Sequence, residues 1–470
     1  MRKEVLLICP HSALEIFKES KISIVIPHIP YVSLASLAGA LLAGGHGVHI
    51  LDLSISKNPL VDLEQKLKVY QPDFVGVTFT TGLCSEAAAI AKKVRELCGL
   101  AKLIAGGAHP SVFPAEPIEK YGFDFSVFGE GELTLSELVS GRDVSAIDGL
   151  AYRGADGQVV INSPRALIGD LDDLPPPAYQ LYNAKNYHSP KVASRRSPVA
   201  AIETSRGCPY SCIYCNKHIF QTKFRAKSPR RVVDEMEILL NLGYKEIHVW
   251  DDCFSADLNH AKGVCDEIVR RGVKVNWNVY NGIRVDRVDE ELLCKLMAAG
   301  CYRLSFGIES GDQAVLNLSQ KGITLEQIKN AVRLANQVGI ETLGFFMVGL
   351  PGETKETFEK TVALAKELDL DLPKIAIATP LPGTKFFDDW REKGLIKSYN
   401  WPDYVLHTKK RVASHPNIGD EEMFKYYNLF YRQLYLRPSF IAKRFWRGLR
   451  TGEIFFDIYY FLKVFIGFKW

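Results

Sequence analysis

Three cysteines are the residues of this sequence best suited to metal chemistry. Cys208, Cys212 and Cys215 form a Cys-x3-Cys-x2-Cys run, while the other cysteines among the 10 in the chain are scattered. Three thiolates on one short loop can bind three irons of a four-iron cluster, and the fourth iron then stays open for chemistry. His218 lies three residues after Cys215, so structural zinc is the alternative, and on spacing alone both metals remain open.

A strand-then-helix pattern comes after the cysteine run and predicts a β/α barrel that positions it. The expected strands are Val199–Glu203, Glu246–Trp250, Lys274–Tyr280, Tyr302–Phe306, Glu341–Val348 and Leu372–Thr379. The expected helices are Pro229–Leu242, Asn259–Arg271, Asp289–Ala299, Thr324–Val338 and Lys355–Leu368. Because a zinc-binding loop does not need a barrel to carry it, this pattern favours the cluster.

The first 140 residues also alternate short β-rich runs with helical patterns, which predicts a parallel sheet in a Rossmann-like or flavodoxin-like domain. The expected strands are Val5–Cys9, Val48–Leu53, Phe74–Thr78, Lys102–Ala105 and Phe125–Phe128, and the expected helices are Ser33–Ala43, Leu60–Val69, Ser85–Leu97 and Glu132–Val139. Ligands of such sheets bind beyond the carboxyl ends of the strands. The glycines and hydroxyl residues in the loops there allow close approach of a ligand, although glycine also closes tight turns. No GxGxxG sequence comes after the first strand, which argues against a dinucleotide.

The sequence divides into four segments. Residues 1–145 hold the first α/β pattern, and residues 198–390 hold the barrel pattern. Between them, residues 146–197 contain a hairpin signal around Gly154-Ala155-Asp156-Gly157 and the run Pro175-Pro176-Pro177, which neither a helix nor a central strand can continue. Residues 391–470 form an extension rich in aromatic and basic residues. The expected fold class is therefore α/β, with a Rossmann-like domain, a partial barrel of six strand–helix units and a helical C-terminal extension.

Composition and charge exclude several classes of protein. The chain of 470 residues is 47% hydrophobic and 24% charged, which is ordinary for globular proteins. Its 58 Lys and Arg residues against 54 Asp and Glu residues leave a net charge of +4, too small to indicate a nucleic-acid partner. The first apolar run is too short for the core of a signal peptide, and no apolar run reaches about 20 residues. We therefore expect a cytoplasmic protein without a membrane-spanning helix.

The C-terminal extension carries an amphipathic pattern between residues 438 and 450. Ile441, Phe445 and Leu449 recur at four-residue spacing, and Lys443 and Arg447 lie on another face of the expected helix. A nearly continuous apolar run extends over residues 454–470. The pattern predicts an interfacial helix whose basic residues anchor it to a membrane surface, a lid over an apolar substrate, or a helix packed on the protein's own barrel.

The barrel segment resembles the radical SAM superfamily over residues 199–384. The matching stretches are the cysteine run, Asp251-Asp252-Cys253-Phe254, Gly307-Ile308-Glu309-Ser310, the stretch from Gly344 to Glu353, and Pro380-Leu381-Pro382-Gly383-Thr384. The resemblance implies that Cys208, Cys212 and Cys215 bind a [4Fe-4S] cluster and that S-adenosylmethionine (SAM) occupies the open iron. It further implies SAM contacts at Tyr214, Asp251, Asp252, Glu309, Gly349 and Pro380. Arg284 is a possible partner for the methionyl carboxylate, and Cys253 has no assigned role.

The first segment resembles the cobalamin-binding domain at the front of many radical enzymes. The matching stretches are residues 30–39, Gly45-His46-Gly47-Val48, Gly106-Gly107-Ala108-His109-Pro110 and Gly129-Glu130-Gly131-Glu132. This resemblance implies cobalamin contacts at Thr78, Thr80, Gly106, Gly107, His109 and Glu130. The Asp-x-His-x-x-Gly motif is missing from the first loop, Cys9-Pro10-His11-Ser12-Ala13, so we expect a cobalt that has no histidine ligand from the protein.

Together the two resemblances imply a cobalamin-dependent radical SAM enzyme whose cofactors are a [4Fe-4S] cluster, SAM and cobalamin. The reduced cluster cleaves SAM, the resulting 5′-deoxyadenosyl radical removes hydrogen from an unactivated carbon, and a methyl group is transferred from cobalt to the substrate. The aromatic extension favours a hydrophobic small molecule of the polycyclic lipid or tetrapyrrole class. We expect flavodoxin or ferredoxin to supply electrons.

Three alternatives remain. A cyclase or rearrangement enzyme of the same architecture would not methylate. A methylthiotransferase-like enzyme that acts on RNA or protein would need a second cluster in the first segment, where Cys9, Cys84 and Cys98 do not cluster in sequence. A zinc-bearing binding module would not be a catalyst at all.

Overall fold

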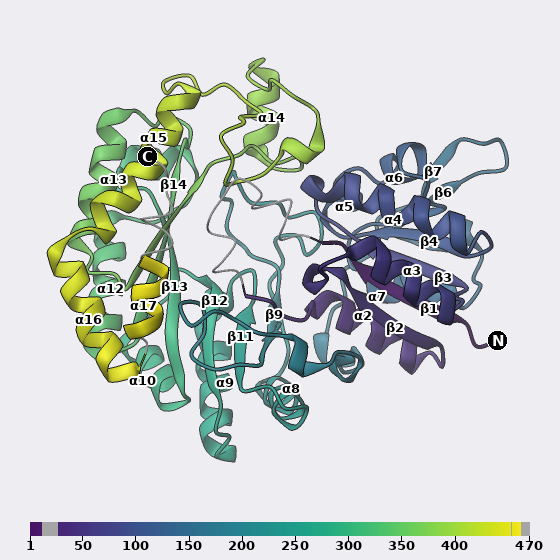
Figure 1. Ribbon diagram of the computed structural model, residues 1–470, viewed down its shortest axis with the longest axis horizontal. Helices are drawn as coiled ribbons and strands as arrows, with labels where there is room; N and C mark the ends of the chain where they lie inside the picture. The colour runs from purple at the N-terminus through teal and green to yellow at the C-terminus, as the bar shows by residue number, and fades with distance from the viewer. Residues whose placement is uncertain (12–26, 453, 462–470) are drawn as a thin grey trace.

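The computed structural model describes residues 1–11, 27–452 and 454–461 (Figure 1). Two α/β units lie side by side, the first in purple and blue and the second in teal and green, and a helical extension in yellow lies against the second. Ser12 and Ala13 of the first loop, and residues 462–470 of the C-terminal apolar run, fall outside the described residues.

The first unit is built on a seven-stranded sheet. Its strand order is β2-β1-β3-β4-β5-β6-β7, and the first five of these strands are parallel. The strands are β1 Glu4–Cys9, β2 Gly47–Asp52, β3 Phe74–Thr78, β4 Lys102–Gly106, β5 Phe125–Val127, β6 Leu150–Arg153 and β7 Val159–Ile161. The hairpin expected between the two units is β6–β7, and it pairs antiparallel with β5 as an extension of this sheet.

Helices cover both faces of the first sheet. They are α2 Val32–Ala43, α3 Pro59–Val69, α4 Cys84–Leu97, α5 Ala108–Val112, α6 Glu116–Lys120 and α7 Gly131–Val139. Successive residues of a strand point to opposite faces, so Leu6 and Ile8 of β1 pack against α3 and α4, whereas Val5 and Leu7 pack against α2 and α7. Because both faces are buried, β1 is a continuous apolar run.

The second unit is a curved sheet of six parallel strands in the order β15-β14-β13-β12-β11-β8. The strands are β8 Val199–Ile202, β11 Glu246–Trp250, β12 Asn276–Ile283, β13 Cys301–Glu309, β14 Glu341–Val348 and β15 Leu372–Ile377. The helices are α8 Pro229–Asn241, α9 Leu258–Arg271, α10 Glu290–Ala298, α11 Gln313–Leu318, α12 Leu325–Val338, α13 Lys355–Glu367 and α14 Lys385–Glu392. This is the expected partial barrel.

Local signals set the ends of these helices. Thr324 caps α12 in a capping box with Gln327, and Gly339 ends the helix with a φ of 87°.

Alternate residues of β11 face opposite sides of the barrel wall. Ile247 and Val249 are buried in the core beneath the helices. The alternate residues, His248 and Trp250, therefore face the inside of the barrel.

The helical extension packs on the protein's own barrel. It contains α15 Asp420–Tyr435, α16 Pro438–Thr451 and α17 Ile454–Phe461. The Tyr431 hydroxyl of α15 donates to the carbonyl of Ile375 in β15 (3.2 Å). Lys443 of α16 forms an ion pair with Asp371 (3.3 Å), and Arg447 forms another with the same carboxylate (2.8 Å).

The ion pairs of α16 correct the prediction that its basic residues anchor the chain to a membrane. Lys443 and Arg447 face the barrel, whereas Phe445, Trp446 and Leu449 are exposed. The helix-packed-on-barrel alternative is therefore the correct one for the basic face of α16. Among the described helices, none has both the length and the hydropathy that crossing a bilayer requires.

Buried ion pairs join the two units. Arg206, in the short strand β9 Ser205–Arg206, donates to Glu130 (3.0 Å) and to Glu132 (2.7 Å) of the first unit, and its side chain is 3% exposed. Arg225 donates to the same Glu130 carboxylate (2.9 Å). These contacts fix the first unit against the start of the cysteine loop.

Candidate functional site

The three cysteines lie on the loop after β8, at the carboxyl end of the barrel. Cys212 is buried, Cys208 is half-buried and Cys215 is exposed. A hydrogen bond with the Cys215 thiol lowers the pKa of Cys212 to about 6, and one with the Cys253 thiol lowers the pKa of Cys208 to about 7. Cys208 and Cys212 therefore favour the thiolate, the form in which cysteine binds metal, close to neutral pH, whereas the hydrogen bond with Cys212 and burial raise the pKa of Cys215.

A four-iron cluster fits this donor set. Among the described residues, no three His, Cys, Asp or Glu side chains converge on one position for a single metal ion. A four-iron cluster takes one thiolate on each of several irons, so its ligands need not converge on one point. Cys253 is buried beside Cys208, which places this unassigned thiol within the same group.

Two carboxylates after β11 hold the base of the cysteine loop. Asp251 accepts hydrogen bonds from the Thr204 amide (2.7 Å) and the Ser205 hydroxyl (2.6 Å). Asp252 accepts one from the Gly207 amide (3.1 Å). The Asp251 side chain is buried and these donors occupy it, so the side chain positions the loop, and a contact of this residue with SAM stays a prediction.

Positive charge surrounds Cys212. Lys321 and Arg284 are both close enough to lower its pKa, and each is buried. Lys321 donates to Glu309 (2.8 Å) at the end of β13. Arg284 stacks on the Tyr210 ring, with 3.5 Å from the guanidinium carbon to the ring centre, and pairs with Asp286 (2.9 Å). Asp286 therefore already neutralises the guanidinium expected as a possible partner for the methionyl carboxylate.

Glu309 occupies an unusual backbone conformation. Its φ is +67°, in the left-handed region that favours glycine. Such strain persists only where the surroundings fix it, and it is common at ligand sites. The structure thus brings Glu309 to the thiol group, as expected, but through an ion pair with Lys321 that no sequence motif indicated.

Tyr214, Gly349 and Pro380 lie around the same end of the barrel. Tyr214 packs on an apolar cluster that contains Leu350 and Ala378. Leu350 directly follows Gly349 in the sequence, and Ala378 lies two residues before Pro380. Gly349 has a φ of +90°, and a Cβ there would lie 2.9 Å from the side chain of Met423. A side chain at position 349 would therefore strain the backbone and clash with Met423.

A buried carboxyl group supports the Gly349 turn. The Gly349 amide donates to Glu353, which is fully buried, and the second carboxylate oxygen of Glu353 has no hydrogen-bond partner among the described residues. Burial raises the pKa of Glu353 to about 8. The carboxyl group is therefore protonated in the folded protein at neutral pH.

Replacing Glu353 with glutamine should change how stability depends on pH. An unfolded chain releases the Glu353 proton near pH 4.5, whereas the folded chain keeps it to about pH 8. The wild type therefore loses stability relative to Glu353→Gln across this window, and the difference becomes constant above it. Melting temperatures of both proteins between pH 5 and pH 9 would measure this difference, with exposed Glu356→Gln as the control. Parallel curves for wild type and Glu353→Gln would contradict the prediction.

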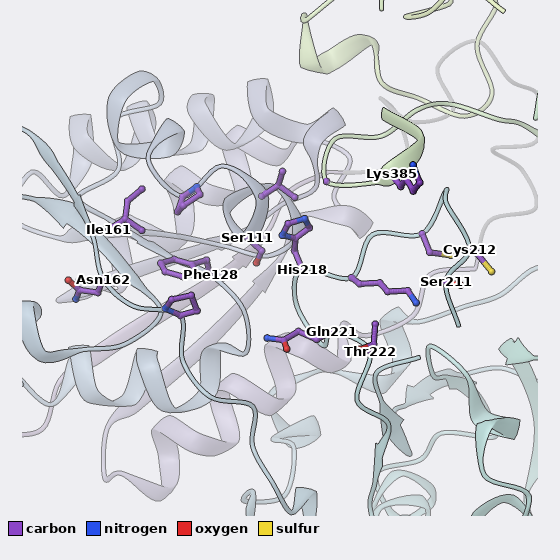
Figure 2. Close-up of a pocket in the computed structure, with 16 residues that line it drawn as sticks. Ser111, Phe128, Ile161, Asn162, Ser211, Cys212, His218, Gln221, Thr222 and Lys385 are labelled. Carbon is purple, nitrogen blue, oxygen red and sulfur yellow. The ribbon is translucent and has the colours of Figure 1, made fainter. Parts of the chain in front are cut away.

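A cavity of about 750 Å³ lies between the cysteine loop and the first unit (Figure 2). Cys212 and Cys215 line it on one side, and Ser111 of α5 and Phe128, directly after β5, line it on the other. Figure 2 also shows Lys385 of α14 at its upper rim. Volumes of this order are typical of ligand sites.

The predicted cobalamin residues occupy the carboxyl edge of the first sheet but do not line the cavity. Thr78 and Gly106 are neighbours in register at the ends of β3 and β4, Thr80 is exposed, and Gly107 has a φ of +98°. A Cβ added at Gly106 would meet no atom within 4 Å, so open space stands over this position. An edge with open space beside a cavity fits a flat ligand such as a corrin.

His109 and Glu130, two residues predicted to contact cobalamin, have side chains that are engaged elsewhere in the structure. His109 is fully buried among aromatic rings that include Phe79 and Trp401, and burial lowers its pKa to about 4. Its side chain therefore cannot reach a ligand in this conformation. Glu130 pairs with Arg206 and Arg225 between the two units, where its buried carboxylate is already satisfied.

Comparison with known proteins identifies both units. The chain matches the Radical SAM superfamily over residues 202–365 and the B12 binding domain over residues 28–139. It is 33% identical over 438 residues to an uncharacterized methyltransferase of Pyrococcus horikoshii, covering 89% of this chain and 93% of that protein.

Two further relatives have more specific names. The anaerobic magnesium-protoporphyrin IX monomethyl ester cyclase of Rubrivivax gelatinosus is 29% identical, with 87% of this chain and 75% of that protein covered. Among solved structures, the radical S-adenosylmethionine methyltransferase TsrM from Kitasatospora setae, with cobalamin and a [4Fe-4S] cluster bound, aligns with a TM-score of 0.68 at 26% identity. The alignment covers 84% of this chain and 75% of TsrM.

Proposed function

Because this chain belongs to the radical SAM superfamily and carries a B12 binding domain in its first unit, we propose that it is a cobalamin-dependent methyltransferase of a hydrophobic small molecule. Its cofactors are a [4Fe-4S] cluster, SAM and cobalamin, which together supply an electron, a radical source and a methyl carrier. The observation that carries the proposal is the cavity that Cys212 and Cys215 share with the carboxyl edge of the first sheet.

The chain's own residues would prepare this site in three ways. Cys208, Cys212 and Cys215 would bind the cluster, with Lys321 and Arg284 favouring the thiolate form of Cys212. SAM would lie against Tyr214, Glu309, Gly349 and Pro380, where Glu309 can accept hydrogen bonds from two adjacent hydroxyls or from an ammonium group. Asp251 and Asp252 would hold the base of the cysteine loop in place through their hydrogen bonds to its backbone.

Cobalamin would lie over Thr78, Thr80, Gly106 and Gly107, at the edge that faces the cavity. Because the first loop lacks the Asp-x-His-x-x-Gly motif, and because His109 is buried, the cobalt would take no histidine ligand from the protein. We also propose that the chain divides into the segments 1–145, 146–197, 198–390 and 391–470, with β6 and β7 of the second segment completing the sheet of the first unit. We propose flavodoxin or ferredoxin as the reductant. Exposed apolar side chains on α16 and α17 support peripheral contact with a membrane, although Lys443 and Arg447 do not take part in it.

The test of methyl transfer measures the fate of SAM. Protein from a cobalamin-fed host and protein without corrin are each reconstituted anaerobically, reduced and incubated with SAM. We expect S-adenosylhomocysteine, the product of methyl donation, only with the corrin-loaded protein. If corrin-loaded protein forms 5′-deoxyadenosine but no S-adenosylhomocysteine, methyl transfer is wrong.

That second outcome would favour a cyclase or rearrangement enzyme. The similarity to the magnesium-protoporphyrin IX monomethyl ester cyclase of Rubrivivax gelatinosus supports this second function, because the two chains align over most of both units. Both functions use the same cysteine loop and differ only in the fate of the substrate radical.

A further inference from the structure

A cluster of aromatic and polar side chains lies inside the barrel, below the cysteine loop. We define it by His248 and Trp250 of β11, Tyr280 of β12, Ser305 of β13 and Lys374 of β15, and call it the lumen cluster. The Lys374 ammonium lies 5.6 Å from the centre of the Tyr280 ring. In the sheet, β14 and β13 separate β15 from β12, a distance of about 14 Å at the usual strand spacing. The contact must therefore cross the concave interior of the curved sheet.

The lumen cluster is accessible to solvent and adjoins the cofactor loop. Trp250 is 40% exposed, at the end of β11, which lies between β12 and the edge strand β8. Tyr280 and Lys374 are both half-buried. Trp250 directly precedes Asp251, which holds the base of the cysteine loop. A molecule bound against Trp250 would therefore lie next to the base of the cysteine loop.

The aromatic members present flat faces. The rings of His248 and Tyr280 are parallel within 4°, with centres 5.7 Å apart, and the Trp250 ring lies 5.8 Å from that of Tyr280. Stacked rings beside an exposed tryptophan suit a planar unsaturated partner, because offset stacking adds to the gain from burying apolar surface.

Lys374 adds an uncompensated positive charge. Among the described residues, no carboxylate forms an ion pair with Lys374; its ammonium group lies over the Tyr280 ring, and its charge adds to burial in lowering the pKa of His407 to about 4. A half-buried lysine without an acidic partner can pair with an anionic group that enters the barrel. The position therefore suits a carboxylate, phosphate or sulfonate group.

Two buried polar atoms of the lumen cluster also lack partners. The Ser305 hydroxyl and His248 Nδ1 have no hydrogen-bond partner among the described residues, and both side chains are buried. His248 Nε2 lies 2.9 Å from the Glu246 carboxylate, which also accepts from the Tyr302 hydroxyl (2.6 Å). Nε2 therefore carries the proton, and Nδ1 presents a lone pair. Buried polar atoms of this kind usually bind water or a ligand.

We propose that the lumen cluster is the substrate-recognition site and that the substrate is an acid with a planar unsaturated ring system. Its anionic group pairs with Lys374, and its ring lies on Trp250 and Tyr280. The inference rests on the proposed function, since it places the substrate next to the base of the cysteine loop. It also narrows that function, because it favours a tetrapyrrole-like acid over a neutral polycyclic lipid.

Two fluorescent dyes with the same ring system test the proposal. 8-Anilinonaphthalene-1-sulfonate carries an anionic group, and N-phenyl-1-naphthylamine is its neutral counterpart. In titrations of the full chain, we expect Lys374→Met to raise the Kd of the sulfonate about 10-fold, the usual size for a charge-assisted contact, and to change the Kd of the neutral dye less than about 2-fold. Trp250→Leu should weaken both dyes, whereas Lys329→Met, on the outer helix α12, should weaken neither.

Lys374→Arg separates recognition from a folding defect. It keeps the charge and should keep most of the affinity for the sulfonate. Equal loss of both dyes in Lys374→Met, or unchanged affinity for the sulfonate, would overturn the proposal. The titrations need neither cluster, SAM nor corrin. Their result can therefore be interpreted even if the test of methyl transfer fails.

Discussion

Replacing Cys212 with alanine is expected to reduce the formation of 5′-deoxyadenosine from SAM by at least about 10³-fold, the scale on which loss of an essential group acts in enzymes. Cys212 is the buried member of the cysteine loop, and Lys321 and Arg284 favour its thiolate form. Without it, one iron loses its ligand and the four-iron cluster cannot assemble with a single open corner. Anaerobic reconstitution and then chromatography of the nucleoside products would measure the effect.

Cys294→Ala is the matched control. Cys294 is exposed on α10, away from the cysteine loop, and its replacement should change neither iron content nor activity. Iron and acid-labile sulfide should fall in Cys212→Ala and remain in Cys294→Ala. Wild-type levels of 5′-deoxyadenosine from Cys212→Ala would show that the cluster is held elsewhere.

Replacing Arg206 with methionine should destabilise the folded protein by about 3–5 kcal/mol, the usual result of leaving buried charges without a partner. Glu130 and Glu132 are both buried, and each loses its hydrogen bond from Arg206. Glu132 depends on this partner: burial raises its pKa, and the Arg206 charge and hydrogen bond lower it below its usual value. Thermal or urea unfolding of the apo-protein would measure the change.

Arg142→Met provides the comparison for Arg206→Met. Arg142 forms an exposed ion pair with Glu137 in the same unit, and exposed pairs contribute at most about 1 kcal/mol. If the two variants unfold at the same denaturant concentration, the buried pairs do not hold the units together. The stability due to the Glu132 pair should also disappear as the pH falls through its lowered pKa, because the carboxylate then becomes protonated.

Strands and long helices could be predicted because their signals are local. The predicted bounds of Phe74–Thr78, Glu246–Trp250 and Glu341–Val348 are those that the structure shows, since buried parallel strands are apolar runs between turns. The short helices α5 and α6 could not be predicted, because five residues are too few to show a helical period. The hairpin β6–β7 could be predicted, but its pairing with β5 depends on contacts distant in sequence.

Site residues with a local sequence signal could likewise be predicted, whereas those placed by contacts distant in sequence could not. Cys208, Cys212 and Cys215 could be found because their spacing alone indicates a metal ligand set, and Glu309 could be found because it ends a strand. Lys321 could not be found, since it reaches Glu309 through the fold and belongs to no motif.

The side-chain positions of Glu130 and His109 could not be predicted from the sequence. Both belong to the loops that resemble a cobalamin site, yet one carboxylate is used between the units and one imidazole is buried among aromatic rings. The sequence shows which loops reach the edge of the sheet but not which way each side chain turns.

The central claim is that three thiolates hold a four-iron cluster with one iron open to SAM. Electron paramagnetic resonance of the reduced, reconstituted protein before and after addition of SAM tests it most directly. We predict that SAM shifts the signal of the cluster, because a ligand on the open iron would change the surroundings of that iron. A four-iron signal that saturating SAM leaves unchanged would contradict the account.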